Sequence, residues 1–266
     1  MPNAISRRDM LAGAAALAIL HRAAPAAAQE LEVPFVPTPA PLVERMLDLA
    51  EVSARDYLID LGCGDGRIAI AAARRGARAL GVDLDPHRID EAVLAARLAG
   101  LETRALFRRQ DLFRTPIFEA DVVTLYLLPR INLALRPRLL TELRPGARVV
   151  SHAFHMGDWR ADAEEQLDGR RIFLWIVPAV AGGSWALTDS DGSAMTLELD
   201  QRFQEVTGTL TGPGRVLNLR DAALRGTRFA FTVDTTAGPR TYRGQIDGAV
   251  MMARPGEPAW HAERLD

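Results

Sequence analysis

The chain has 266 residues, of which 48% are hydrophobic and 25% charged, a composition typical of a globular protein and not of a fibre or a disordered chain. Its formal net charge of −2 excludes the strongly basic composition of proteins that hold nucleic acid through phosphate contacts. The single cysteine, Cys63, excludes an intrachain disulfide and a site with several thiolate ligands. All 32 residues counted as Lys or Arg are arginine, so no lysine side chain can act as a Schiff-base nucleophile.

The N-terminus has the order of residues found in a secretory signal. Arg7 and Arg8 form a twin-arginine pattern, an apolar run follows to Leu20, and Ala-rich sequence ends at Ala28. The apolar run is about half of the roughly 20 residues needed to cross a bilayer, so the pattern disfavours a transmembrane helix. We expect a signal peptide over residues 1–28 and a periplasmic or secreted protein. The alternative is an unstructured Ala-rich start on a cytoplasmic protein.

Residues 29–181 alternate between apolar, strand-like runs and helical stretches rich in Ala, Leu and Arg. This alternation predicts βα units and a parallel sheet with helices on both faces. The predicted strands are, in chain order, 57–61, 79–83, 103–107, 120–127 and 148–154. The predicted helices are 41–50, 68–75, 86–99 and 131–143. The strand at 120–127 is almost wholly apolar, so we expect both of its faces to be covered.

Residues 182–266 have a different pattern, with short alternating segments separated by Gly, Pro, Asn and Asp. Examples are the segments 195–199, 203–207 and 228–233. The flexible pair Gly182-Gly183 marks the boundary. The pattern predicts a small antiparallel all-β domain, either a barrel or a sandwich. Its larger aromatic residues are most simply core residues, and the alternative is a module that binds a substrate or a partner.

The strongest signal of chemistry is a glycine-rich turn between a predicted strand and a predicted helix, Asp60-Leu-Gly-Cys-Gly-Asp-Gly66. Glycines permit a sharp turn and a close approach to a ligand, and a helix start supplies free N–H groups. The dinucleotide-binding fingerprint needs its third glycine where Arg67 stands. The spacing of Gly62, Gly64 and Gly66 behind a leading acid instead resembles motif I of the class I S-adenosylmethionine (SAM) methyltransferases. Asp60 is then placed to help hold the ammonium group of SAM, directly or through water.

Two further acids follow predicted strands. Asp83 ends the second strand, where a carboxylate can accept hydrogen bonds from both ribose hydroxyls. Asp111 follows the third strand, where the methyltransferase pattern often places an adenine contact. The alternative for each acid is a helix cap or a turn. Because ligands of open α/β sheets bind at the carboxyl ends of strands, the acids and glycines together predict a SAM site. Its residues are Asp60, Gly62, Gly64, Gly66, Asp83 and Asp111.

More segments extend the resemblance over residues 33–159. They are Val33–Pro39, Asp60–Ile68, Gln110–Leu112, Gly146–Ser151 and Trp159. With them the chain is similar to the small seven-strand methyltransferases that include the lysine N-methyltransferases of the ATP synthase c subunit and the adenine nucleotide translocator, and to bacterial relatives of these. The resemblance implies a Rossmann-like methyltransferase sheet, SAM as cofactor, and a protein lysine as one candidate acceptor. It also implies that residues 33–39 close over the SAM site. Residues 182–266 and the export-type signal have no counterpart in the mitochondrial enzymes.

The acceptor pocket is expected in the loops after the fourth and fifth strands, which lie over the methyl group in this fold. Methyl transfer from a sulfonium is an in-line displacement without a protein nucleophile, so positioning supplies much of the rate. Tyr126 is alternatively a core residue of its apolar strand. We expect four residues to line the pocket and two others to be further candidates. The four are Tyr126, His152, Phe154 and Trp159, and the two are Asn132 and Asp158.

Other chemistries are disfavoured by the sequence. The Asn/Asp-Pro-Pro-aromatic motif of enzymes that methylate DNA or glutamine amides is absent. His152 and His155 lie three residues apart, and on a strand such residues point to opposite faces, so we expect no metal site.

Export raises the question of a SAM supply, because SAM is a cytosolic metabolite. Three hypotheses follow. The protein works in the cytosol or at the inner face of the membrane before export; or it is exported as a SAM-binding or structural protein with a degenerate methyltransferase fold; or the N-terminal segment is not a signal.

Overall fold

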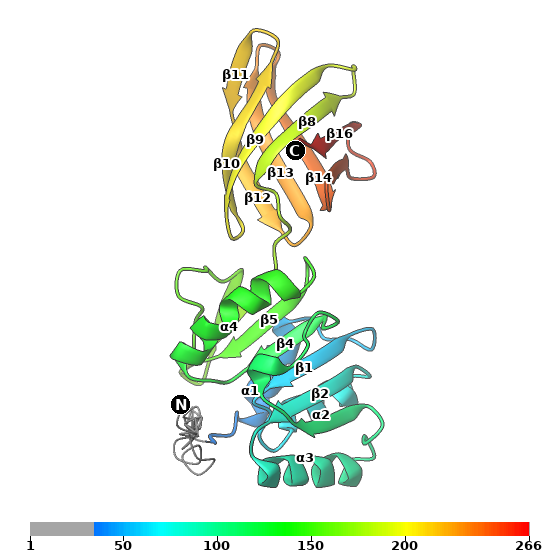
Figure 1. Ribbon diagram of the computed structural model, residues 1–266, viewed down its shortest axis with the longest axis vertical. Helices are drawn as coiled ribbons and strands as arrows, with labels where there is room; N and C mark the ends of the chain where they lie inside the picture. Colours follow the sequence, from blue (N-terminus) through cyan, green and yellow to red (C-terminus); the bar gives the residue numbers. More distant parts are fainter. Residues whose placement is uncertain (1–34, 266) are drawn as a thin grey trace, which may run out of the picture. The chain divides into compact units, whose positions relative to one another are not determined.

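The fold was analysed in a computed structural model, which describes residues 35–265 (Figure 1). The signal peptide predicted for residues 1–28 lies outside this range. Within it, no helix is long and apolar enough to span a membrane.

The first sheet has seven strands in the order β3-β2-β1-β4-β5-β7-β6. Five of them are parallel: β1 (Tyr57–Leu61), β2 (Arg78–Asp83), β3 (Ala105–Arg109), β4 (Val122–Leu125) and β5 (Arg148–His152). The strands β6 (Ala163–Leu167) and β7 (Arg170–Ile176) form a hairpin, in which β7 is antiparallel to β5. The predicted parallel, Rossmann-like sheet is confirmed.

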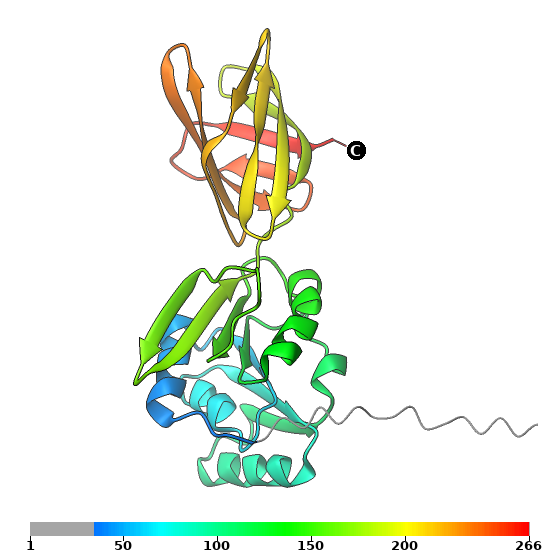
Figure 2. The same ribbon diagram turned by 90° about the vertical axis from the view of Figure 1, so that its left-hand side faces the viewer.

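Helices cover both faces of this sheet. They are α1 (Ala40–Leu49), α2 (Arg67–Arg74), α3 (Pro86–Leu98) and α4 (Pro129–Glu142), with a short 3-10 helix, η1 (Leu112–Arg114). On one face, α1 and α2 share a hydrophobic core with Leu58, Val122 and Val150 of three central strands. On the opposite face, Asn132 of α4 reaches Ser151, the neighbour of Val150 on β5. Figure 2 shows α1 and α4 on opposite sides of the sheet.

Four details of the first sheet differ from the prediction. The fourth strand is shorter than the predicted 120–127 and spans Val122–Leu125. The third strand begins two residues late, because Arg104 and Ala105 both donate to the carbonyl of Leu101 and so close the turn after α3. The fifth strand ends at His152 because Ala153 has φ +67°, outside the extended region. The hairpin of β6 and β7 was not anticipated as a pair. The expectation that the fourth strand is covered on both faces is confirmed, since all four residues of β4 are buried.

The second sheet is an antiparallel, barrel-like sheet of nine strands in the order β11-β10-β9-β8-β16-β15-β14-β13-β12. Their bounds are β8 (Gly183–Asp189), β9 (Ala194–Arg202), β10 (Glu205–Gly212), β11 (Arg215–Asn218), β12 (Arg220–Arg225), β13 (Arg228–Thr235), β14 (Gly238–Asp247), β15 (Val250–Ala253) and β16 (Trp260–Arg264). The predicted antiparallel all-β domain is confirmed. The first sheet ends at Ile176 and the second begins at Gly183, on either side of the predicted boundary.

The second sheet encloses an aromatic core. Its members are Trp185, Phe229, Phe231, Tyr242 and Trp260. Phe203 is not among them, because it lies in the turn between β9 and β10 with φ +56°. The simpler interpretation of these aromatic residues, as core, therefore holds for all of them except Phe203.

Candidate active site

The glycine-rich turn is bound to the end of β2. The N–H groups of Gly62 and Cys63 both donate to the carbonyl of Val82, each at 2.9 Å. Gly62, Gly64 and Gly66 all have positive φ, at 81°, 51° and 78°, a region that side chains disfavour. A Cβ on Gly64 would also lie only 2.3 Å from the Phe35 ring. The turn therefore needs glycine for its backbone conformation and for the close approach of Phe35.

Asp60 is a buried carboxylate with one oxygen free. Its side chain is 1% exposed, and Oδ1 accepts a hydrogen bond from the Thr124 hydroxyl at 2.7 Å. Oδ2 is buried and has no hydrogen-bond partner among the described residues. Burial, against the opposing effect of the Thr124 hydrogen bond, raises the pKa of Asp60 to about 7. A buried acceptor without a partner is unfavourable, so Asp60 fits a ligand that brings a cationic donor, as the ammonium group of SAM does.

Asp83 is oriented by the glycine turn itself. Its Oδ2 accepts a hydrogen bond from the Gly64 N–H and its Oδ1 from the Asp85 N–H, both at 3.0 Å. Each carboxylate oxygen has two lone pairs, so both keep capacity for ribose hydroxyls. The carboxylate is thereby held beside the turn that the cofactor would contact.

Asp111 lies near Asp83, because the neighbouring Gln110 N–H donates to the carbonyl of Asp83 at 2.9 Å. Its own carboxylate caps η1 by accepting from the Phe113 N–H at 2.8 Å. The alternative reading as a helix cap is thus observed, and the adenine contact stays a prediction.

Three of the four predicted pocket residues come together next to the carboxyl ends of β4 and β5, and two of them lie on the sheet face that carries Asp60. Asp60 pairs in register with Thr124, and Thr124 with Val150, so Tyr126 and His152 follow two residues later on the same face. The rings of Tyr126 and His152 are stacked with centroids 3.8 Å apart. The Phe154 ring, in the loop after β5, is stacked with Tyr126 at a centroid distance of 6.4 Å. Tyr126, His152 and Phe154 are called the aromatic cluster below.

His152 is the most buried member of the aromatic cluster, at 2% exposure. Burial, with a smaller contribution from the charge of Arg170, lowers the pKa of His152 to about 4. The imidazole is therefore neutral at physiological pH, and the cluster presents rings without a charge.

Trp159 lies apart from this cluster. It is 1% exposed, packs against Trp175 and Phe203, and donates from Nε1 to Gln204 at 3.0 Å. Its surroundings are those of a core residue, and the structure does not bring it to the predicted pocket.

The two further candidates have structural contacts as well. Asn132 is fully buried and donates from Nδ2 to Ser151 Oγ at 3.1 Å and to the Phe154 carbonyl at 3.2 Å, which fastens the loop after β5. Asp158 is exposed, and its hydrogen bonds with Arg202 and Arg136 lower its pKa.

The structure adds residues that the sequence did not single out. Thr124 satisfies one oxygen of Asp60, and the strand register would have revealed it once the strand order was known. Thr38 lies 3.1 Å from His152 through its hydroxyl, and its carbonyl accepts from Arg67 at 2.9 Å. Both contacts of Thr38 join distant segments, so no local sequence pattern predicts them.

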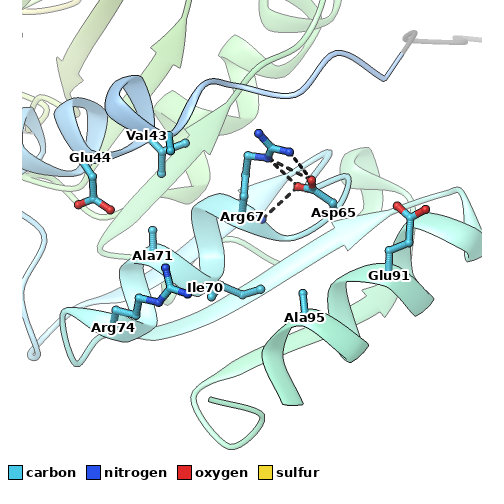
Figure 3. Close-up of a pocket in the computed structure, with 10 residues that line it drawn as sticks. Val43, Glu44, Asp65, Arg67, Ile70, Ala71, Arg74, Glu91 and Ala95 are labelled. Atoms are coloured by element: carbon cyan, nitrogen blue, oxygen red, sulfur yellow. Dashed lines mark hydrogen bonds and ion pairs between the residues drawn. The ribbon is translucent and has the colours of Figure 1, made fainter. Parts of the chain in front are cut away.

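A groove of about 460 Å³ lies on the outer side of α2, between α1 and α3 (Figure 3). Its floor includes Val43, Ile70 and Ala71, and of the glycine turn only Asp65 contributes to its wall. Asp60, Asp83 and the aromatic cluster do not line it. Its acidic side chains are paired with arginines: Glu44 with Arg75, Asp65 with Arg67 and Glu91 with Arg88. The groove is therefore a different place from the predicted SAM site.

No group of three His, Cys, Asp or Glu side chains suited to a metal ion occurs in the part of the chain that the structure describes.

Comparisons with known proteins identify the family. Residues 60–163 match the model of the ANTKMT methyltransferase domain. A protein-lysine N-methyltransferase of Saccharolobus islandicus is 46% identical over an alignment of 151 residues, and the match covers 54% of this chain and 94% of that protein. The chain belongs to this methyltransferase family. It is a SAM-dependent methyltransferase, and nothing in the comparisons supports a degenerate fold without activity.

Two other relatives bear on the acceptor. The adenine nucleotide translocase lysine N-methyltransferase of Mus musculus is 37% identical over 131 residues, 49% of this chain and 57% of that protein. A solved structure, described as an RNA methyltransferase from Salinibacter ruber in complex with S-adenosyl-L-homocysteine, is 50% identical with a TM-score of 0.53. That match covers 53% of this chain and 94% of the solved chain.

Proposed function

We propose that the enzyme methylates a lysine side chain of a protein, and that the aromatic cluster lines the pocket for this side chain. The observation that carries the proposal is the ring contact of Tyr126 with His152 and Phe154 next to the carboxyl ends of β4 and β5, with Tyr126 and His152 on the sheet face of Asp60. The similarity to a protein-lysine N-methyltransferase supports the choice of acceptor.

The cluster suits an amine that must react in its neutral form. A lysine amine, with an ordinary pKa of about 10.4, must lose its proton before it can attack a methyl group. Desolvation against uncharged rings lowers the pKa of an amine, because burial disfavours the charged form. His152 contributes to this as a neutral ring, and its low pKa makes it a poor base. The pocket therefore favours the neutral amine through burial, and the proton leaves to solvent.

The opposite end of the site holds the cofactor. When bound, SAM supplies an electrophilic methyl group on a sulfonium. Asp60 offers its free buried oxygen to the ammonium group, and Asp83 offers its two oxygens to the ribose. The glycine turn beside them has the left-handed backbone conformation that glycine permits, and its Gly64 N–H holds Asp83 in place.

The test is transfer of radiolabelled methyl from SAM to fractionated host lysate, followed by mass spectrometry of the labelled material. The enzyme has no lysine, so it cannot contribute a labelled lysine side chain of its own. We expect protein fractions to gain label, and acetylation of lysate amines beforehand to abolish it. Asp83→Ala serves as the cofactor-deficient control. Label that persists in fully acetylated lysate would overturn the lysine assignment.

RNA is the second candidate acceptor, because the solved structure at 50% identity is described as an RNA methyltransferase. Treatment of the lysate with ribonuclease separates the two. Methylated RNA would lose its label in this arm and keep it after acetylation, whereas methylated lysine behaves in the opposite way.

We also propose export of the protein through its twin-arginine signal, with cleavage near Ala28. The support is the order of Arg7, Arg8, the apolar run and the Ala-rich end. Mass spectrometry of protein from the native host should find a mature N-terminus close to Gln29, and an intact Met1–Gln29 segment would contradict export. If export is confirmed, activity in the cytosolic precursor would show that methylation precedes it.

A further inference from the structure

Thr38 joins two parts of the site that are far apart in the sequence. It lies just before α1 and is 3% exposed. Its hydroxyl is 3.1 Å from Nδ1 of His152, a residue 114 positions later in the chain. Its carbonyl accepts a hydrogen bond from Arg67 Nη1 at 2.9 Å. Thr38 therefore contacts the aromatic cluster with its side chain and the start of α2 with its backbone.

Arg67 is itself fixed by the glycine turn. Its guanidinium binds Asp65 through three hydrogen bonds of 2.5 to 3.1 Å, which Figure 3 shows as dashed lines. These hydrogen bonds outweigh the effect of burial and lower the pKa of Asp65, so the pair stays ionised at neutral pH. The order of contacts is thus Asp65, Arg67, Thr38 and His152, leading from the cofactor turn to the acceptor pocket.

The segment that carries Thr38 is stiff. Pro37 and Pro39 flank Thr38, and proline fixes its own φ and keeps the preceding residue extended. Two residues before Pro37, the Phe35 ring lies against Gly64 and carries the Arg88 guanidinium 3.9 Å above its centroid. The segment is held at both ends, so the Thr38 hydroxyl is presented to His152 in a defined place.

The Thr38 hydroxyl is the hydrogen-bond partner of the His152 ring among the described residues. In a neutral imidazole one ring nitrogen donates and the other accepts, and the Thr38 hydroxyl can take either role at Nδ1. Without the hydroxyl, Nδ1 would be buried without a partner, and both the tautomer and the ring orientation against Tyr126 would be less defined.

We propose that Thr38 is a positioning residue for methyl transfer: it orients His152 in the aromatic cluster and, through Arg67, ties that cluster to the cofactor turn. The inference rests on the proposed role of the aromatic cluster as the acceptor pocket. It adds a residue on the N-terminal side of α1 that acts through His152 and does not touch the reacting atoms.

The first experiment compares Thr38→Val, which keeps the shape and removes the hydroxyl, with Thr38→Ser, which keeps the hydroxyl. The rates are initial rates of labelling of the lysate fraction that accepts methyl from SAM. We expect Thr38→Val to lower the rate at saturating acceptor about tenfold, the size of a lost hydrogen bond, with a SAM affinity within about twofold of wild type. Thr38→Ser should stay within about threefold in rate. A wild-type rate in Thr38→Val, or equal losses in both variants, would overturn the positioning role.

The second experiment observes the imidazole of His152 directly and needs no methyl acceptor. Nuclear magnetic resonance of the imidazole nitrogens reports the tautomer, and the chain has only five histidines to assign. We expect Thr38→Val to change the His152 tautomer ratio and Thr38→Ser to preserve it, while unchanged His152 signals in Thr38→Val would contradict the proposal. If Thr38→Val does not fold, Thr38→Ala replaces it. A label that resists acetylation of the lysate would refute the lysine acceptor alone, because the Thr38 rates and the tautomer are measured independently of acceptor identity.

Discussion

Asp60 is the residue whose environment is best explained by a ligand. A carboxylate that is buried, holds a single hydrogen bond and leaves one oxygen free is unfavourable in the protein alone. The same arrangement becomes favourable when a cationic donor is bound beside it. Asp60 therefore links the stability of the free protein to cofactor binding, and the two should respond to substitution in opposite directions.

Asp60→Asn should stabilise the free enzyme at pH 8 and weaken SAM binding. The native pKa of about 7 lies above the ordinary 3.8, so the native state binds this proton more tightly than the unfolded state. The resulting contribution is fully present below pH 3.8 and is lost as the pH rises through 7, on the order of 4 kcal/mol. The amide avoids that loss but has no negative charge to pair with an ammonium group, so affinity should fall tenfold or more. Thermal unfolding with and without SAM measures both, and a less stable variant with normal affinity would contradict this role.

Asp83→Ala should weaken SAM binding by about 1.5–3 kcal/mol, the scale of hydrogen bonds to a charged group. The carboxylate also holds the Gly64 and Asp85 N–H groups, so the glycine turn loses two acceptors at the same time. Calorimetry with SAM gives the affinity, and circular dichroism checks the fold. An affinity equal to that of the wild type in a folded variant would show that the ribose lies elsewhere.

His152 should make the protein sensitive to acid. Its native pKa of about 4 lies below the ordinary 6.5, so the unfolded state takes up the proton first as the pH falls. Its contribution is fully present above pH 6.5 and is lost as the pH falls through 4, at most about 3 kcal/mol. Denaturant unfolding from pH 7 to 4 should show a smaller loss of stability in His152→Gln than in the wild type. Parallel curves for the two proteins would contradict the burial argument.

Among the single residues, the sequence predicted those that belong to a local motif. Asp60 and Asp83 lie in the last two residues of β1 and β2, the three glycines come directly after β1, and strand ends can be predicted from apolar runs. Thr124 and Thr38 could not be predicted, because their partners Asp60 and His152 are 64 and 114 positions away. Trp159 was expected in the pocket from its place in the loop after β5, but packing against Trp175 places it in the core.

Among the elements, the glycine turn and the segment before α1 depend on each other. A Cβ on Gly64 would lie 2.3 Å from Phe35, at a φ of +51° that side chains disfavour. Gly100 also has a positive φ, +67°, but a Cβ there would have no heavy atom within 4 Å. An alanine at Gly100 would therefore introduce backbone strain alone, whereas an alanine at Gly64 would introduce both backbone strain and a steric clash.

Gly64→Ala should lower SAM affinity more than tenfold and destabilise the protein by several kcal/mol, because both effects act there. Gly100→Ala should cost only about 1 kcal/mol and leave the affinity unchanged. Calorimetry and thermal unfolding of both variants provide the comparison. Equal affinities in the two variants would mean that Phe35 does not need to approach the turn.

The elements of the first sheet were predictable where the pattern is periodic. The strands β1 and β2 and the helices α1 to α4 lie within two residues of the sequence prediction. The β6–β7 hairpin was not predicted as such, because the partly buried face of β6 has only Ala163 and Leu167 as apolar residues, with Glu165 between them. The end of β5 depends on the positive φ of Ala153, and an alanine gives no indication of a positive φ in the sequence.

The molecule as a whole contains two sheets of different kinds. The seven-stranded sheet carries the cofactor residues and the aromatic cluster at its strand ends, as expected for an open α/β sheet. The nine-stranded sheet encloses its own aromatic core. The pattern of segments along the sequence indicated the two kinds of sheet, since the alternation of predicted strands and helices stops near Gly182.

A crystal structure of the enzyme with S-adenosyl-L-homocysteine tests the cofactor site most directly. The ammonium group should lie within hydrogen-bond distance of Asp60 Oδ2, and the ribose hydroxyls should lie within hydrogen-bond distance of Asp83. A ligand bound instead in the groove between α1, α2 and α3, with Asp60 Oδ2 still unpaired, would contradict the assignment.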